Sequence, residues 1–241
     1  MSTEKMNEVY LRGRISHIYG NDSFGSLQVP YSIIITRPSR ENGQPAKLLQ
    51  VVETYFPEVI FNSNTKTKNI IQTFRKNDRV LIKGYIASHT APTEKGYEER
   101  TALYIDEIEH DVTKMEQLFG ISGIGSKFSE PMHEIRLEAK ITGMTKLREH
   151  MYEFRLECEK NDRSYPVTGT YFRAPADLDT MFKLNDQVYV IGYMQTARKE
   201  FRGKAIFSHT FVIDDIVPKK EVVEKYNEMI KAQNAETESV E

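Results

Sequence analysis

One short stretch combines two side-chain chemistries that suit single-stranded nucleic acid. Residues 198–204, RKEFRGK, set one phenylalanine among four basic residues at a predicted hairpin tip. Cations neutralise phosphates, and an aromatic ring stacks on a base for roughly 1–3 kcal/mol per base. The corresponding loop at 93–100, TEKGYEER, also holds an aromatic residue, but it is acidic. We therefore expect the two loops to differ in affinity.

Further aromatic and basic residues occupy predicted strand positions that face outward. Such positions offer rings for bases and cations for the backbone, although a tyrosine on a strand more often packs against the neighbouring strand. Arg40, Lys47 and Arg100 belong to this outward set. Its main candidates for nucleic-acid binding are Tyr10, Arg12, Arg14, Arg37, Tyr55, Lys83, Tyr85, Tyr97, Arg136, Lys140, Arg155, Tyr171, Arg173, Tyr189, Tyr193, Arg198, Lys199, Phe201, Arg202 and Lys204.

The residue types that catalysis or metal binding would need form no recognisable set. The six histidines are scattered without ligand spacing, and no nucleophile motif occurs. The single cysteine, Cys158, excludes a disulfide framework and is expected to be a small buried hydrophobe. Residues 120–125, GISGIG, lack the Lys-Ser/Thr that a phosphate-binding loop requires. We expect no enzyme activity, no cofactor and no metal site.

Charge is nearly balanced, with 33 Lys and Arg against 35 Asp and Glu and a net charge of −2. A nucleic-acid binder often has a basic domain, so a phosphate-binding surface here would need local segregation of charge. The first residues, MSTEKMNEVY, contain no apolar run typical of a signal peptide, and no stretch is long enough to span a bilayer. These features predict a cytoplasmic protein, in a bacterium or an infected host cell, with no membrane partner.

The chain contains an internal repeat, and its two copies would position these residues. Residues 73–87, TFRKNDRVLIKGYIA, match residues 181–195, MFKLNDQVYVIGYMQ. Each copy has a polar turn and then a strand with apolar residues at period two, which indicates one buried face. A glycine within such a strand indicates a sharp bend. The matched pairs are Phe74 with Phe182, Asn77-Asp78 with Asn185-Asp186, and Gly84-Tyr85 with Gly192-Tyr193.

Around each copy the sequence predicts five strands, with a short connecting segment between the third and the fourth. This order is that of the OB-fold, a small Greek-key barrel. The predicted fold is mainly all-β, with two tandem OB-fold five-stranded barrels, short connecting helices and a C-terminal helix. Besides the repeated strand, the predicted strands are 7–18, 31–37, 48–56 and 101–109 in the first barrel, and 133–142, 152–159, 165–173 and 205–216 in the second.

The repeat also predicts the domain boundaries. We expect an N-terminal OB-fold over 1–112, a linker over 113–131, a C-terminal OB-fold over 132–217, a helix over 218–233 and a disordered acidic tail over 234–241. We interpret Tyr55-Phe56 and Tyr171-Phe172 as equivalent ends of the third strands. The apolar stripe of the C-terminal helix is expected to dock on its own barrel rather than on a partner. The residues predicted as core are Phe56, Phe74, Phe172 and Phe182.

Two segments carry a resemblance to a known family. Residues 7–15, NEVYLRGRI, resemble the opening strand of bacterial and phage single-stranded-DNA-binding proteins, and residues 69–108 resemble their helix, turn, strand, long hairpin and closing strand. Through the repeat, the chain is similar to the tandem OB-fold form of that family. The resemblance implies a protein that coats and protects single-stranded DNA without sequence choice during replication, recombination or transfer, by base stacking and phosphate contacts.

Several points stay open at this stage. The alternative function is a tandem OB-fold adaptor that binds proteins in a replication or other assembly and does not bind nucleic acid, because OB-folds serve many functions. The bound strand could be RNA instead of DNA. The protein could form a homo-oligomer, and replication or recombination proteins could bind through the C-terminal helix.

Overall fold

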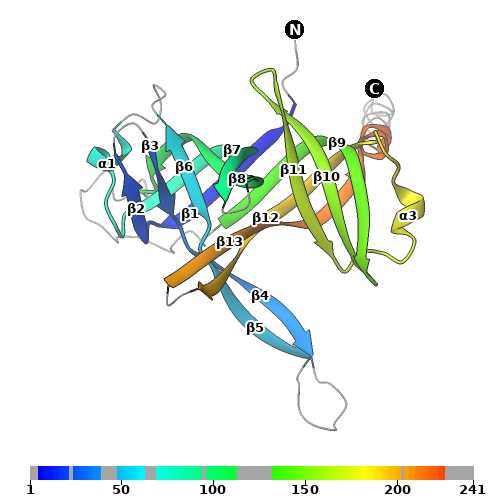
Figure 1. Cartoon of the computed structure of the whole chain (residues 1–241), viewed down its shortest axis with the longest axis horizontal. Helices are drawn as coiled ribbons and strands as arrows, with labels where there is room; N and C mark the ends of the chain where they lie inside the picture. Colours follow the sequence, from blue (N-terminus) through cyan, green and yellow to red (C-terminus); the bar gives the residue numbers. More distant parts are fainter. Residues whose placement is uncertain are drawn as a thin grey trace, which may run out of the picture.

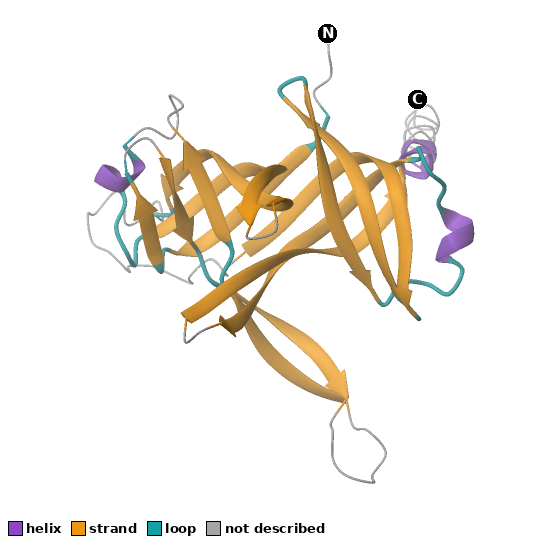
Figure 2. Ribbon diagram, viewed as in Figure 1, coloured by secondary structure: helices purple, strands orange, loops and turns teal. Residues whose placement is uncertain are grey.

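The computed structural model describes residues 5–21, 24–38, 48–62, 69–93, 96–112, 132–201 and 204–225, and the side chains at 37–38, 48–49, 91–93, 198–201 and 204–207 lie outside the description. Strands dominate it (Figures 1 and 2). Within the described residues, helices are too short or too polar to cross a membrane. The elements are β1 (Asn7–Arg14), β2 (His17–Gly20), β3 (Phe24–Gln28), β4 (Tyr31–Pro38), β5 (Leu48–Tyr55), β6 (Glu58–Asn62), α1 (Ile70–Thr73), β7 (Arg79–Thr93), β8 (Gly96–His110), β9 (Met132–Arg148), β10 (Met151–Lys160), β11 (Arg163–Phe172), α3 (Leu178–Met181), β12 (Gln187–Phe201) and β13 (Lys204–Pro218).

The strands form two OB-fold barrels, as predicted. Parallel pairing of β6 with β8 closes the first barrel, and parallel pairing of β11 with β13 closes the second. The short helices α1 and α3 lie between the third and fourth OB strands of the two barrels. In the first barrel the second and third OB strands continue outward as β4 and β5, which pair only with each other and protrude as a ribbon (Figure 1).

The repeated turn has the same structure in both barrels. Asn77 and Asn185 adopt left-handed backbone angles, with φ of 75° and 74°, which asparagine tolerates better than most residues. The carboxylate of Asp78 accepts a hydrogen bond from the backbone N–H of Arg75 at 2.7 Å, and that of Asp186 accepts one from Lys183 at 2.8 Å. The Asn-Asp pair is therefore structural in both copies.

The repeated glycines mark the bends. The pairing of β7 with β8 shifts register between Lys83 and Gly84, and that of β12 with β13 shifts between Ile191 and Gly192. A Cβ atom would lie 1.9 Å from a backbone oxygen at Gly84 and 2.1 Å from one at Gly192. Only glycine allows the two strands to approach so closely at these bulges.

The two barrels are joined strand to strand. β1 pairs antiparallel with β9, and Val9 lies opposite Ile135. Val9 also lies opposite Gly84, as Ile135 does opposite Gly192, so Val9 and Ile135 are equivalent positions. An approximate two-fold axis therefore passes near this pair, and both barrels share one sheet of 11 strands and one hydrophobic core.

Each barrel extends a long hairpin over the other (Figure 1). The β7–β8 hairpin contacts β11, and the β12–β13 hairpin contacts β5. Of the predicted loop 93–100, residues 93 and 96–100 belong to these extended strands. The predicted C-terminal helix is seen over residues 219–225. The predicted linker, 113–131, and tail, 234–241, lie outside the described residues.

The predicted equivalence of Tyr55-Phe56 with Tyr171-Phe172 is wrong. Val59 and Gly169 occupy the same position in the parallel pair that closes each barrel, so Tyr55 corresponds to Tyr165. The pattern misled because the third strand of the first barrel breaks at residues 56–57, between β5 and β6.

Two of the four predicted core phenylalanines are buried. Phe74 and Phe182 are 5% and 2% exposed, and Cys158 is fully buried, as predicted. The prediction is wrong for Phe56 and Phe172, which are 36% and 40% exposed. Phe56 lies in the break between β5 and β6, and Phe172 is the last residue of β11, so neither has a strand neighbour on every side.

Candidate nucleic-acid interface

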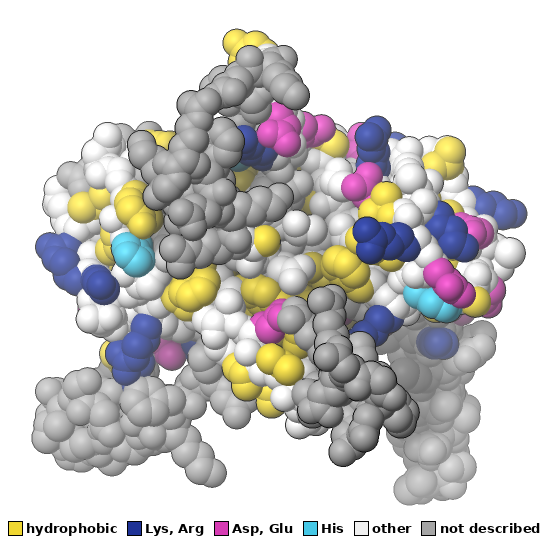
Figure 3. Space-filling model, turned by 60° about the horizontal axis from the view of Figure 1, so that its bottom comes forward, with side chains coloured by type: hydrophobic (Ala, Val, Ile, Leu, Met, Phe, Trp, Pro, Cys, Tyr) yellow, Lys and Arg dark blue, Asp and Glu magenta, His cyan; other side chains and the backbone are white. Residues whose placement is uncertain are grey.

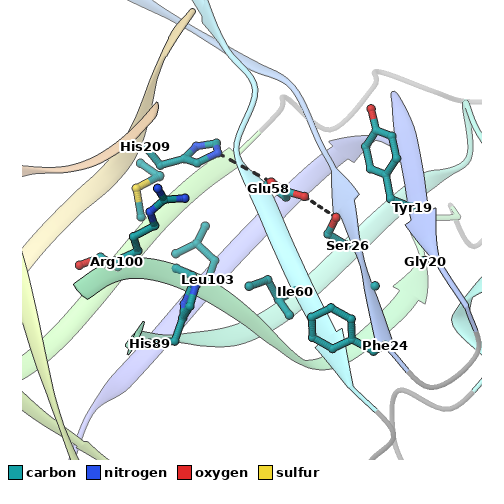
Figure 4. Close-up of a pocket in the computed structure, with 14 residues that line it drawn as sticks. Tyr19, Gly20, Phe24, Ser26, Glu58, Ile60, His89, Arg100, Leu103 and His209 are labelled. Carbon is teal, nitrogen blue, oxygen red and sulfur yellow. Dashed lines mark hydrogen bonds and ion pairs between the residues drawn. The ribbon is translucent and has the colours of Figure 1, made fainter. Parts of the chain in front are cut away.

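A groove crosses the outside of the first barrel, where the β12–β13 hairpin of the second barrel meets it (Figure 4). Its volume is about 350 Å³. Strands β2, β3, β6 and β8 supply most of its wall, and Met194 and His209 come from the second barrel. The face of the second and third OB strands, with the loops between the first and second and between the fourth and fifth strands, is the part of an OB-fold that binds oligonucleotides.

Two exposed aromatic rings stand on one side of this groove. Tyr19 is 52% exposed and Phe24 is 62% exposed. They flank the turn between β2 and β3, in which the Asn21 side chain accepts a hydrogen bond from the Phe24 N–H at 3.0 Å. The Tyr19 ring also lies parallel to the His17 ring, with centroids 5.7 Å apart. Because both rings are more than half exposed, they can act as platforms for bases.

The opposite side of the groove is polar. Arg100 contributes a guanidinium that is half exposed and lies 3.3 Å from Glu98. The Glu58 carboxylate accepts a hydrogen bond from Ser26 and lies 4.0 Å from Nε2 of His209 (Figure 4). Burial lowers the pKa of His209, while Glu58 raises it by a smaller amount. The groove thus joins apolar platforms to a cation and to hydrogen-bonding groups.

The second barrel has no matching platforms. Tyr19 lies opposite Ser26 and Phe24 opposite Asn62 in the first barrel. By the same register the second barrel has Thr145 and Met151 at these positions. At these two positions, aromatic rings therefore occur in the first barrel and not in the second.

Seven predicted site residues lie on the outer face of the central strands β7, β1, β9 and β12. Most of their charges are paired there. Arg136 forms an ion pair with Glu134 and lies over the Tyr10 ring at 5.6 Å, and Lys140 pairs with Glu157. Exposed pairs of this kind leave little net charge for phosphates. The seven residues are Tyr10, Arg12, Arg14, Lys83, Arg136, Lys140 and Tyr189.

Five more predicted residues lie where each hairpin meets the other barrel. Tyr55 is 5% exposed, so the expectation that it faces outward is wrong: its ring stacks on Tyr193 at 6.0 Å. Tyr171 and Arg173 line the same region. Tyr85 stacks on Tyr104 at 5.2 Å in the equivalent region of the other hairpin. The structure thus brings these tyrosines together between the barrels rather than on an open face.

The remaining predicted residues are scattered or undescribed. Tyr97 is 82% exposed near the tip of β8, and Arg155 is exposed on β10. The side chains of Arg37, Arg198, Lys199, Phe201, Arg202 and Lys204 lie outside the described residues. On the face shown in Figure 3, basic and acidic side chains are interspersed, with hydrophobic side chains across the middle.

Sequence reasoning missed Tyr19, Phe24, His89 and His209, which all line the groove. Residues 20–25, GNDSFG, have the composition of a turn, and the rule that the first OB loop contacts oligonucleotides would have drawn attention to the aromatic residues beside it. The two histidines carry no comparable signal, because only the tertiary fold brings β7 and β13 to this groove.

Comparisons of the sequence found no matching family model and no matching curated protein. The structure is similar to the wild-type single-stranded DNA-binding protein from Thermus aquaticus, with 13% identity, coverage of 90% of this chain and 94% of that chain, and a TM-score of 0.56. A deletion mutant of that protein matches with 12% identity, coverage of 89% and 95%, and the same TM-score of 0.56. The chain therefore shares the overall fold of the Thermus aquaticus single-stranded DNA-binding protein.

Proposed function

We propose that the protein binds single-stranded DNA without sequence choice, and that the groove of the first barrel is its main base-binding site. The main support for this proposal is the pair of half-exposed rings, Tyr19 and Phe24, beside Arg100 on an OB-fold barrel. Stacking tolerates every base, because each base has a π-face. The shared fold with a single-stranded DNA-binding protein supports this proposal without deciding it.

In this proposal bases stack on Tyr19 and Phe24, and the backbone passes Arg100 toward the hairpin tips. Tyr97 adds a further exposed ring at one tip, and the basic stretch 198–204 supplies phosphate contacts at the other. Such a protein would coat and protect single-stranded DNA during replication, recombination or transfer in a bacterium, a phage or a plasmid system.

Binding of a fluorescent oligo-dT, followed by anisotropy at two salt concentrations, tests the proposal. Removing both rings in Y19A/F24A should weaken binding at least about tenfold, since stacking contributes roughly 1–3 kcal/mol per base. The matched control is T145A/M151A, at the equivalent positions of the second barrel, which should bind within about twofold of wild type. No binding by micromolar wild-type protein at low salt would overturn the proposal.

The salt dependence tests the phosphate contacts separately. Changing Arg198, Lys199, Arg202 and Lys204 together to Ala should weaken binding and flatten the plot of log affinity against log salt, because each lost phosphate contact reduces the slope by roughly one. An unchanged slope would remove this loop from the site. Comparison of oligo-dT with oligo-rU in the same assay decides between DNA and RNA.

One observation favours the adaptor function as a second candidate. Ile34 and Val52 lie directly opposite each other on the protruding β4–β5 ribbon and are 68% and 66% exposed. An exposed apolar pair on a protruding element suits contact with another protein. Val222 and Val223 of the C-terminal helix are also partly exposed, at 39% and 43%. This second function would be supported if the wild-type protein does not bind oligonucleotides but binds another protein through these residues.

A further inference from the structure

A second and larger cavity lies between the barrels. Its volume is about 680 Å³, within the range of small-molecule sites. It lies where the β12–β13 hairpin crosses β4 and β5, and we call this region the open seam, defined by Tyr31, Ile33, Tyr55, Tyr193 and Asp214. The proposed DNA-binding groove is a separate cavity, and it shares no lining residue with this one.

The two-fold relation supplies a second copy of the region to compare with it. The β7–β8 hairpin crosses β10 and β11 in what we call the closed seam, defined by Tyr85, Tyr104, Asp106, Lys160 and Tyr165. Gly84 lies opposite Ile105, and Gly192 lies opposite Ile213. The next residues along these strands are therefore equivalent: Tyr85 corresponds to Tyr193, and Asp106 to Asp214.

The closed seam is filled by the chain's own cation. The Lys160 ammonium lies 3.2 Å from a carboxylate oxygen of Asp106, and both side chains are largely buried. The same ammonium lies 5.9 Å from the centroid of the Tyr85 ring. Tyr104 stacks on the Tyr85 ring, with centroids 5.2 Å apart. Carboxylate and aromatic ring together are the groups that bind an ammonium ion well.

The open seam keeps the carboxylate and the ring, but another residue stands at the position of Lys160. Tyr31 lies opposite Tyr55 as Cys158 lies opposite Tyr165, so Tyr31 and Cys158 are equivalent. Two residues further along each strand, Ile33 of β4 is therefore equivalent to Lys160 of β10. By the same register Glu53 replaces Arg163. On the other wall, Val212 lies opposite Tyr193 where Tyr104 lies opposite Tyr85. The exchange on β4 removes the lysine, and the smaller Val212 leaves space.

The polar groups that line the open seam include Asp214, His133 and Arg173. Asp214 forms no ion pair with any described residue, and burial, with Asp215 nearby, raises its pKa. Neither ring nitrogen of His133 has a hydrogen-bond partner among the described residues. Arg173 lies at the exposed edge of this lining and donates to the backbone oxygen of Thr36 at 3.0 Å. The Asp214 carboxylate would attract an ammonium group.

We propose that the open seam binds an alkylammonium ligand, whose charged group takes the place beside Asp214 and Tyr193 that Lys160 fills beside Asp106 and Tyr85. The ammonium donates to the Asp214 carboxylate and lies against the tyrosine rings. The alkyl chain lies in the cavity beside Ile33 and Val212. This site is independent of the proposed DNA binding, so either can fail without the other.

Isothermal titration of the full chain with putrescine and spermidine tests this site. The expected result is saturable binding of one ligand per chain, with no binding of 1,4-butanediol, the uncharged analogue. Asp214→Asn should weaken binding at least about tenfold through loss of the charge-assisted contact. Asp215→Asn is the matched control, with the same change in charge one residue away, and should change affinity less than about twofold.

A gain of charge provides the complementary variant. Ile33→Lys recreates the arrangement of the closed seam, so its own ammonium should fill the site and abolish putrescine binding. Equal loss in D214N and D215N, retained binding in I33K, or equal binding of 1,4-butanediol would overturn the proposal, as would no saturable binding at millimolar putrescine. Nα-acetyl-lysine amide, titrated in parallel, distinguishes the sources: tighter binding than putrescine indicates a lysine side chain of a partner protein, and weaker binding indicates a free amine.

Discussion

The closed and open seams share one backbone plan and differ in what fills them. In the closed seam Asn7 donates to the backbone oxygen of Ile86 at 2.9 Å and accepts from its N–H at 3.0 Å. Its equivalent in the open seam is His133, whose ring nitrogens have no partner among the described residues. The Tyr31 hydroxyl instead bonds the oxygen of Met194 at 2.8 Å. One copy of a duplicated contact is thus fully satisfied, while the other keeps unused polar groups beside a cavity.

In a duplicated fold, the difference between two equivalent regions indicates which copy could bind a ligand. A seam in which each polar group meets a partner from the chain itself holds the barrels together. A seam that retains acceptors and space is free to bind something else. The same contrast holds for the base platforms, because Tyr19 and Phe24 of the first barrel correspond to Thr145 and Met151 of the second.

The largest expected effect is a pH dependence of stability that belongs to the open seam. Burial lowers the pKa of His133 to about 3, against roughly 6.5 when unfolded. Between these values the unfolded chain binds the proton and the folded chain does not. The free energy of unfolding should therefore fall by roughly 1.4 kcal/mol for each pH unit from about 6.5 down to about 3.

Urea denaturation of His133→Asn, which copies the residue of the closed seam, checks this. The variant should lose that part of the slope, whereas His17→Asn, which removes an exposed histidine, should keep it. An unchanged slope in His133→Asn would show that the histidine is protonated in the folded protein and that the seam is open to water.

A second, smaller difference concerns the two equivalent side chains at neutral pH. Asn7→Ala leaves the N–H and oxygen of Ile86 without their buried partner and should lower the free energy of unfolding by roughly 1–3 kcal/mol. His133→Leu removes nitrogens that have no described partner, so its stability should stay within about 1 kcal/mol of wild type. Equal losses at the two positions, measured by urea midpoints, would contradict the contrast between the seams.

A change in ligand stoichiometry is expected for Lys160→Met. The ion pair with Asp106 is largely buried, so the variant leaves a carboxylate without its cation and should also lose stability. The variant should, however, convert the closed seam into a second open one. Calorimetry should then count two putrescine molecules per chain in place of one, and a stoichiometry that stays at one would argue that the two seams are not equivalent.

Sequence patterns predicted the barrels better than the site. The strands, the Asn77 and Asn185 turns and the bulge glycines are local features, and the repeat doubled their signal. The pairing of β1 with β9 could not be foreseen, because alternation along a strand says which face is buried but not which strand lies beside it. Tyr55 was misplaced for that reason: its side chain meets Tyr193 only because a hairpin from the other barrel covers it.

The groove was missed for a related reason. Tyr19 and Phe24 flank a polar turn, where an aromatic residue gives no periodic signal, and His209 reaches the groove from the second barrel. Most of the basic residues predicted to face outward on strands do so. Their ion-pair partners, such as Glu134 and Glu157, lie at positions that only the sheet register brings close to them.

Photo-crosslinking tests most directly whether the first barrel holds the bases. An oligo-dT that carries 5-iodouracil is irradiated with the full-length protein, and the crosslinked peptides are identified by mass spectrometry. The proposal that the first barrel holds the bases predicts crosslinks at Tyr19 and Phe24, and their loss when excess unlabelled oligo-dT competes. Crosslinks confined to the second barrel, or none at saturating DNA, would contradict it.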